Sequence, residues 1–252
     1  MLMMRDFITD QRLHKALDEV EAWFGYEFTA APMPLSHRER AKCTMHMHPR
    51  TNECQLLFIE DEPQSQACYC HELGHVVMWI LGAPCTCYSK PIAFSDLLNY
   101  EPIYLSWNLL QHIPLWELTR DIGFDESEGY QQLLQNMIDM ISQHRFYLDA
   151  PSELRTPFQS VALAFGLAAP STQEIHVQIR TVAEERIPPA LELADAILSD
   201  FEKLSLLSEQ GFQAALIRLF DIIKPPITHL QLSFLDRIDP SFRSRILEAA
   251  KL

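Results

Sequence analysis

Hydrophobic residues recur at helical spacing near the start of the chain, over residues 9–24. They repeat at intervals of three and four residues, which gathers apolar side chains on one face of an α-helix. The positions are Leu13, Leu17, Val20 and Phe24. Thr9 or Asp10 suits the N-cap of such a helix, and Gly25 suits its end. The pattern therefore predicts an amphipathic helix over residues 9–24.

Three short stretches after this helix have the composition of β-strands: YEFTAAPM, AKCTMHMHP and ECQLLFIED. The third contains a continuous apolar run, with Asn52 before it and Asp61, Glu62 and Pro63 after it. Asn, Asp and Pro typically lie at the ends of strands. The sequence therefore predicts a small β-sheet directly before the next helix.

A second helix is predicted from Ser65 to Leu81, where apolar residues become almost continuous. Gly82 suits the C-cap, and Pro84 cannot continue a helix. The pentapeptide HELGH lies in the middle of this segment. We therefore expect this helix to carry the candidate functional residues.

The rest of the chain is predicted to be mostly helical. We expect a loop over residues 83–94, then a helix over about residues 95–110 that bends or restarts near Pro102. Two helices should follow on either side of residues 123–128. Beyond Pro151 the pattern is helical throughout, divided by prolines at 170, 188, 189, 225, 226 and 240. This predicts an all-helical C-terminal region.

Composition bounds the number of domains. The chain has 252 residues, of which 48% are hydrophobic and 21% charged, so it can bury a proper core. We expect one domain over residues 1–150 and a helical domain over residues 151–252, for which we hypothesise a sensing or partner-binding role.

The N-terminus is acidic from Asp6 onward, and no apolar run approaches the ~18 residues of a membrane span. These features predict a cytoplasmic protein without a membrane partner.

The net charge of −14 is unevenly distributed. Residues 1–150 hold 10 basic and 21 acidic side chains, whereas residues 151–252 hold 10 and 13. The N-terminal part would repel a phosphate backbone, so we expect no direct nucleic-acid binding there. A basic protein substrate would be attracted, although acidity that only keeps the protein in solution explains the charge equally well.

His71, Glu72 and His75 match the HExxH pattern of zinc peptidases. Residues four apart on an α-helix lie on the same face, so both imidazoles can bind one zinc ion. Glu72 is turned by about 100° from His71, beside the metal, where it can act as general base. The alternative is that all three are satisfied core residues, which would place three costly polar groups on a buried helix.

A catalytic zinc site needs a third protein ligand. The extended metzincin pattern is excluded, because it would require Gly and His where the chain has Met78 and Leu81. A carboxylate from a later helix is expected instead. The candidates are Asp96, Glu101 and Glu117.

The order of these segments resembles that of the ImmA/IrrE-type metallopeptidases, over about residues 9–140. The similarity lies in a helix ending in WFGYEF, a sheet ending in CQLLFIED, the HELGH motif, and a helix led by a glutamate, EPIYLSWNLLQHIP. The resemblance implies a zincin-like α+β fold and favours Glu101 as the third ligand. Pro102 and Ile103 replace the family's usual Ala-Asn after this glutamate. Residues 151–252 have no counterpart in the resemblance.

The resemblance also implies a function. Members of the family are intracellular zinc peptidases that cut a partner transcriptional repressor of helix-turn-helix type, in a stress response, in mobile-element induction or in phage defence. We therefore expect a hydrolase of the gluzincin-like metalloprotease class with Zn²⁺ as cofactor. The alternatives are a catalytically silent zinc-binding regulatory protein, and a metal-dependent enzyme with a non-peptide substrate.

Six cysteines lie between residues 43 and 87, two of them shortly after the motif. Cys85 and Cys87 follow His75 closely enough for a thiolate to fold back onto the zinc. We hypothesise that one of them is an inhibitory fourth ligand, while unligated thiols remain the simpler reading. His112 follows the Glu101 helix and is read either as a group that polarises a substrate carbonyl or as an ordinary helix-end histidine.

Overall fold

Caps at both ends define the first long helix, α1 (Gln11–Phe24). The Asp10 carboxylate accepts a hydrogen bond from the Arg12 amide at 2.8 Å, and Gly25 ends the helix with a φ of +81°. The apolar positions Leu13, Leu17 and Val20 are fully buried. The predicted amphipathic helix is therefore confirmed.

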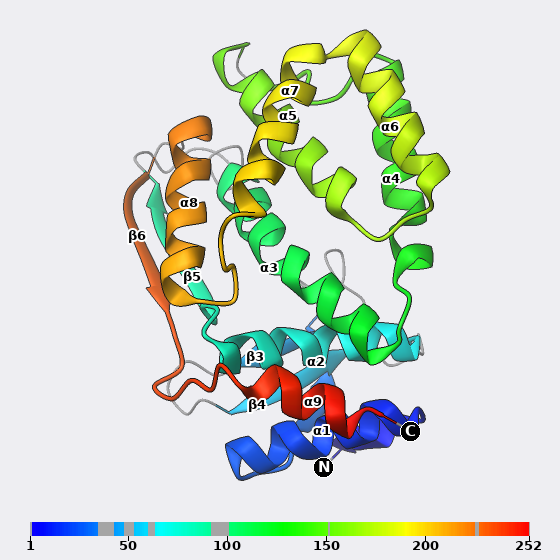
Figure 1. The fold of residues 1–252 in the computed structure, drawn as a ribbon, viewed down its shortest axis with the longest axis vertical. Helices are drawn as coiled ribbons and strands as arrows, with labels where there is room; N and C mark the ends of the chain where they lie inside the picture. The colour runs from blue at the N-terminus through cyan, green and yellow to red at the C-terminus, as the bar shows by residue number, and fades with distance from the viewer. Residues whose placement is uncertain are drawn as a thin grey trace. The chain divides into compact units, whose positions relative to one another are not determined.

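The computed structural model describes residues 2–34, 43–47, 53–59, 64–91, 101–150, 152–224 and 227–251, with side chains undescribed at 86–91, 101–104 and 227–231. Over these residues the protein has an α+β fold that is mostly helical (Figure 1). It contains a small mixed sheet of four strands. The predicted α+β class is confirmed.

The four-stranded sheet has the order β1-β2-β4-β3. Its strands are β1 (Leu2–Met3), β2 (Thr29–Pro32), β3 (Cys43–Met47) and β4 (Cys54–Phe58). The two central strands, β2 and β4, run parallel, and each outer strand is antiparallel to its neighbour. The three predicted strands are confirmed, and β3 lies at an edge of the sheet. The very short strand β1 was not predicted.

The HELGH motif lies within α2 (Gln66–Leu81), as predicted. The Ser65 hydroxyl accepts a hydrogen bond from the Cys68 amide at 3.2 Å and caps the helix. Gly82 ends it in the left-handed region, with a φ of +115°. The helix packs against α1 and against the edge strand β3.

The chain forms two units of tight packing. The first comprises residues 1–85, 117–125 and 234–252. It contains the sheet, α1, α2 and the last helix, α9 (Phe242–Ala249), which lies beside α1 (Figure 1). The Asp239 amide donates to the Ile80 carbonyl at 2.7 Å, so the C-terminal segment is bonded to the end of α2.

The second unit comprises residues 86–116 and 126–233. It is built mainly from helices, with α5 packed on α7 and α4 on α6 (Figure 1). The helices are α3 (Glu101–Ile122) up to residue 116, α4 (Ser127–Ser142), α5 (Ser152–Ala168), α6 (Gln173–Arg186), α7 (Pro188–Phe201) and α8 (Glu209–Ile223). A two-stranded sheet of β5 (Thr86–Pro91) and β6 (Ile227–Ser233) completes it.

The structure corrects three expectations. The C-terminal region is not all helical, because β6 pairs with β5 over a long sequence separation. The loop expected over residues 83–94 is partly that strand, β5. The helix expected to end at residue 110 continues through Pro114 to Ile122 as α3, with only one backbone donor lost at the proline.

The domain boundary expected near residue 150 stays a prediction. The segments of the two units alternate along the chain. The units describe how segments pack, and they do not test whether residues 1–150 or residues 151–252 fold alone. Within the described part of the chain, no helix has both the length and the apolar character needed to cross a lipid bilayer.

Replacing Ser65 by alanine should destabilise the protein, because the Cys68 amide loses its capping acceptor. We expect the free energy of unfolding to fall by about 1 kcal/mol, and Ser65→Asp to restore it. Urea denaturation followed by circular dichroism measures both. Ser152→Ala, at an exposed serine that begins α5, is the control and should change stability by less than about 0.5 kcal/mol. An equal loss in both alanine variants would contradict the capping role.

Candidate metal centre

The two motif histidines lie on one side of α2. The ring centroids of His71 and His75 are 5.0 Å apart, and the ring planes are inclined by 79°. Both side chains are half-buried, whereas the residues between them and after His75 are buried. Over residues 69–81 the two histidines are therefore the partly exposed positions of a buried segment, where they can reach a ligand.

Buried apolar side chains hold α2 in this orientation. Leu73, Val76, Val77 and Ile80 are at most 1% exposed. Burying four aliphatic side chains contributes roughly 1.5–3 kcal/mol each, which is enough to fix the helix against the sheet. The histidines are then positioned by the backbone of a helix that cannot rotate without exposing this apolar face.

Glu72 points to the sheet. Its side chain is 8% exposed, and its Oε2 atom accepts a hydrogen bond from the Met45 amide of β3 at 2.7 Å. Since β3 is an edge strand, an outward-facing amide there needs an acceptor from outside the sheet. A carboxylate accepts up to about four hydrogen bonds, so this bond orients Glu72 and leaves it capacity to take a proton.

His112 lies on α3. Its Nδ1 atom is 2.7 Å from the Asn108 carbonyl oxygen. A carbonyl only accepts, so Nδ1 carries the proton and donates, and in the neutral ring the lone pair is on Nε2. Aromatic rings of Trp116 and Phe165 pack against the imidazole, with centroids 5.5 and 5.7 Å away. Such a backbone bond at one ring nitrogen is the usual support of a histidine that binds metal through the other.

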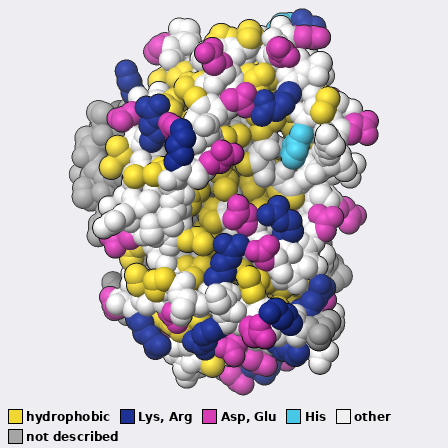
Figure 2. Space-filling view, viewed as in Figure 1, with side chains coloured by type: hydrophobic (Ala, Val, Ile, Leu, Met, Phe, Trp, Pro, Cys, Tyr) yellow, Lys and Arg dark blue, Asp and Glu magenta, His cyan; other side chains and the backbone are white. Residues whose placement is uncertain are grey.

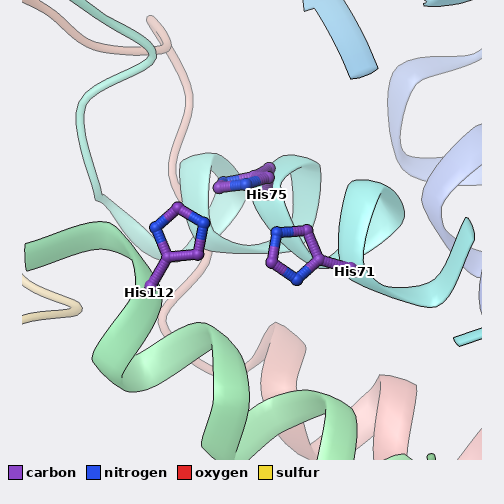
Figure 3. A group of neighbouring side chains, drawn as sticks. All are labelled: His71, His75 and His112. Carbon is purple, nitrogen blue, oxygen red and sulfur yellow. The ribbon is translucent and has the colours of Figure 1, made fainter. Parts of the chain in front are cut away.

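Three imidazoles are near enough to share a metal ion. The ligand nitrogens of His71, His75 and His112 all lie within 4.8 Å of one another. Figure 3 shows the three rings turned toward one another, two from α2 and one from α3. Three neutral imidazoles with a fourth position for solvent match the donor set of one class of catalytic zinc sites. The three residues could therefore hold a metal ion, and their donor set is one that suits zinc.

The other predicted ligands are placed differently. Glu117 is exposed and is not one of the three grouped side chains. The side chain of Glu101, which begins α3, lies outside the described residues, as does Asp96. The assignment of Glu101 as third ligand thus stays a prediction beside that of His112.

The cysteine hypothesis also stays a prediction. Cys85 is half-buried, and burial raises the pKa of its thiol to about 12. Without a metal nearby this thiol is protonated at neutral pH. Cys85 is not part of the three-histidine group, and the side chain of Cys87 lies outside the described residues.

His112 was not predicted from the sequence as a metal ligand. Its Nδ1 atom donates to the backbone carbonyl of Asn108, a helical turn earlier. Backbone carbonyls are present at every position, so the sequence alone gives no reason to prefer this histidine. The preference comes from the spatial grouping with His71 and His75.

Charge is mixed on the surface that Figure 2 draws. Acidic and basic side chains are interspersed over this face, and no large area has a single sign. Among the described residues, ion pairs join Arg180 to Asp195 and Arg218 to Asp200. The net charge of −14 therefore acts at long range more than through one acidic patch on this face.

Comparison of the chain with protein-family models, with curated proteins and with solved structures gave no match.

Substitution of the histidines should identify the ligands. We expect the purified protein to bind one zinc ion, and His71→Ala, His75→Ala and His112→Ala each to weaken binding by more than ~100-fold, since even outer-shell partners cost ~10–100-fold. Competition with a chromogenic chelator measures the affinity.

The control for this experiment is His176→Ala, because that histidine also bonds a backbone carbonyl, Ala169, at 3.0 Å but is not in the group. Its zinc affinity should be unchanged. Glu101→Gln separates the two assignments of the third ligand. A loss of zinc with Glu101→Gln and none with His112→Ala would rule out the histidine.

Proposed function

We propose that the protein is a zinc-dependent peptidase in which His71, His75 and His112 hold the metal and Glu72 is the general base. The observation that carries the proposal is the grouping of three imidazole nitrogens within 4.8 Å, with an oriented carboxylate next to one of them in sequence. A buried glutamate directly after a ligand histidine is the arrangement that HExxH peptidases use.

A bound zinc ion would act as a Lewis acid and would lower the pKa of water at the site. The chain's own residues then do the rest. Glu72, held by the Met45 amide, takes the proton of the attacking water and delivers it to the leaving amine. The Nδ1 bond of His112 fixes the neutral tautomer that a ligand requires.

His112 is preferred to Glu101 as third ligand on the basis of this tautomer and of the spatial grouping. Three histidines would depart from the two-histidine, one-glutamate set that the ImmA/IrrE resemblance implies. Both sets leave an open coordination position for catalysis, so the choice between them does not alter the role proposed for Glu72.

The proposed substrate is a basic partner protein, with a helix-turn-helix repressor as the first candidate. The acidic net charge favours such a partner, and the family resemblance supplies its class. Cleavage of that repressor in a stress, mobile-element or phage-defence response would then be the biological role.

One observation favours the second candidate, a catalytically silent zinc-binding regulatory protein. The bond from the Met45 amide gives Glu72 a structural task, so the fold alone would explain a buried carboxylate at this position. Zinc would then stabilise the protein, or the protein would sense the zinc supply. In either case the protein would act by binding a partner.

Glu72→Gln distinguishes the two candidates. The amide oxygen of glutamine can still accept from Met45, so we expect stability and zinc binding to be retained while peptide cleavage falls by ~10²–10⁴-fold. Cleavage is measured by mass spectrometry of a peptide library and of the candidate repressor, with the zinc-loaded protein.

Glu72→Ala is the matched variant, because it removes the acceptor as well as the base. The buried Met45 amide then lacks this partner, and the free energy of unfolding should fall by about 1–3 kcal/mol. If the Glu72→Gln variant cleaves peptides as fast as the wild type, Glu72 is not the general base. Absence of cleavage by the wild type, with both zinc and fold intact, would favour the silent protein.

A further inference from the structure

One arginine joins the beginning of α1 to the end of α3. The Nη1 atom of Arg12 donates to the Gly123 carbonyl at 2.9 Å, although the two residues are 111 positions apart along the chain. The same guanidinium lies over the ring of Phe124, 4.4 Å from its centroid. Both contacts are within the first unit, which contains residues 1–85 and 117–125. Arg12 therefore links two helices that are distant in the sequence.

The capping residue of α1 holds this arginine in place. The Asp10 carboxylate accepts from Nε and Nη2 of Arg12 at 3.1 and 2.7 Å, and also from the Arg12 amide. Two parallel bonds from a guanidinium fix its plane as well as its position. The guanidinium lowers the pKa of the Asp10 carboxyl, so the pair is charged at neutral pH. Nη1 is left to bond a third group, and that group is the end of α3.

The end of α3 has a shape that admits the arginine. Gly123 has a φ of +98°, and the Phe124 amide donates back to the Thr119 carbonyl at 3.0 Å, which is a common way for a helix to end. A Cβ atom at residue 123 would lie 2.5 Å from Nη1 of Arg12, so a side chain there would displace the guanidinium. A cation beside the last carbonyls of a helix is also favourable, because the negative end of the helix dipole lies there.

The segment before α1 is bonded to the motif helix as well. Gln66 is the first residue of α2, and its Oε1 atom accepts from the amides of Thr9 and Asp10 at 2.8 and 3.1 Å. Its Nε2 atom donates to the Phe7 carbonyl at 3.1 Å. Asp10 is thus bonded to α2 through its amide and to the arginine through its carboxylate.

These bonds connect the two helices that carry the grouped histidines. His71 and His75 are on α2, whose first residue holds the segment before α1. His112 is on α3, whose end is held by the arginine. The helix between residues 112 and 122 is ~15 Å long, so a displacement of its end also moves the imidazole. Metal sites keep their ligand distances within ~0.2 Å, so a small displacement is enough to weaken binding.

We propose that Arg12 is a positioning residue of the metal centre, which holds His112 at the distance from His71 and His75 that a shared ion requires. It acts through α3 and is not itself a ligand. Loss of its guanidinium would leave all three imidazoles in the chain but free the end of α3 to move. The role rests on the proposed three-histidine centre and not on peptide cleavage, so it applies equally to a silent zinc-binding protein.

Zinc affinity of the full-length protein, measured by competition with a chromogenic chelator, tests this role. We expect Arg12→Gln to weaken zinc binding about tenfold, the lower end of the ~10–100-fold cost of losing an outer-shell partner. Arg12→Lys should have an intermediate affinity. Lysine keeps the positive charge, but a single ammonium group cannot reproduce the fork that bonds Asp10 and Gly123 together.

The decisive comparison repeats Arg12→Gln in a protein that already carries His112→Ala. Two residues that act through one contact are not additive, so the arginine substitution should weaken zinc binding no further once this ligand is gone. A further tenfold loss in the double variant would overturn the proposal, since Arg12 would then act on the centre by another route. Unchanged affinity of Arg12→Gln alone would overturn it as well.

Arg245→Gln is the matched control. Arg245 donates to Glu19 of α1 at 2.6 Å and lies over the ring of Phe242, 5.0 Å from its centroid. It makes the same two kinds of contact as Arg12, but it joins α1 to α9, which carries none of the three histidines. Both variants should shift the urea midpoint to lower concentration, and only Arg12→Gln should lose zinc affinity. An equal loss of affinity in both would contradict the specific role.

Circular dichroism establishes that each variant is folded under the binding conditions, and Arg12→Lys carries the comparison if Arg12→Gln does not fold. A wild type that binds zinc but cleaves no peptide would refute the peptidase and leave the role of Arg12 intact. A wild type that binds no zinc would refute the metal centre and this role together.

Discussion

The hydrogen bond from the Met45 amide to the Glu72 carboxylate is the contact on which the rest of the candidate site depends. It joins an edge strand to the motif helix across a buried interface. A buried carboxylate is costly unless it is paired, and an edge amide is costly unless it has an acceptor. Each group removes the penalty of the other. Together with the buried apolar face of α2, this bond fixes the position of the helix, and His71 and His75 are fixed with it.

Local features of the fold could be predicted from the sequence because their causes are local. Capping side chains, helical periodicity and a terminal glycine are all present within the segments 9–25 and 65–82, and both helices lie where these features put them. The strands before the motif were equally readable from short apolar runs. For the same reason the facing of His71 and His75 followed from their spacing alone.

The features that could not be predicted from the sequence depend on contacts with residues far away along the chain. β6 reads as a strand only because β5, far earlier in the chain, supplies its hydrogen bonds. Pro114 did not end α3, since packing along that helix outweighs one lost backbone bond. His112 has nothing in its local sequence that marks a ligand. Its candidacy depends on tertiary neighbours and on a carbonyl that fixes its tautomer.

The residues of the HELGH pentapeptide have different contacts because their side chains point in different directions. Consecutive helical residues point about 100° apart, so a helix that turns His71 and His75 to its partly covered face must turn Glu72 toward a neighbouring element. Here that element is the strand β3, which supplies a backbone donor for the carboxylate. The backbone of β3 holds the Glu72 carboxylate through a bond that involves no ion. The orientation of Glu72 is therefore set by the strand and does not depend on the three imidazoles.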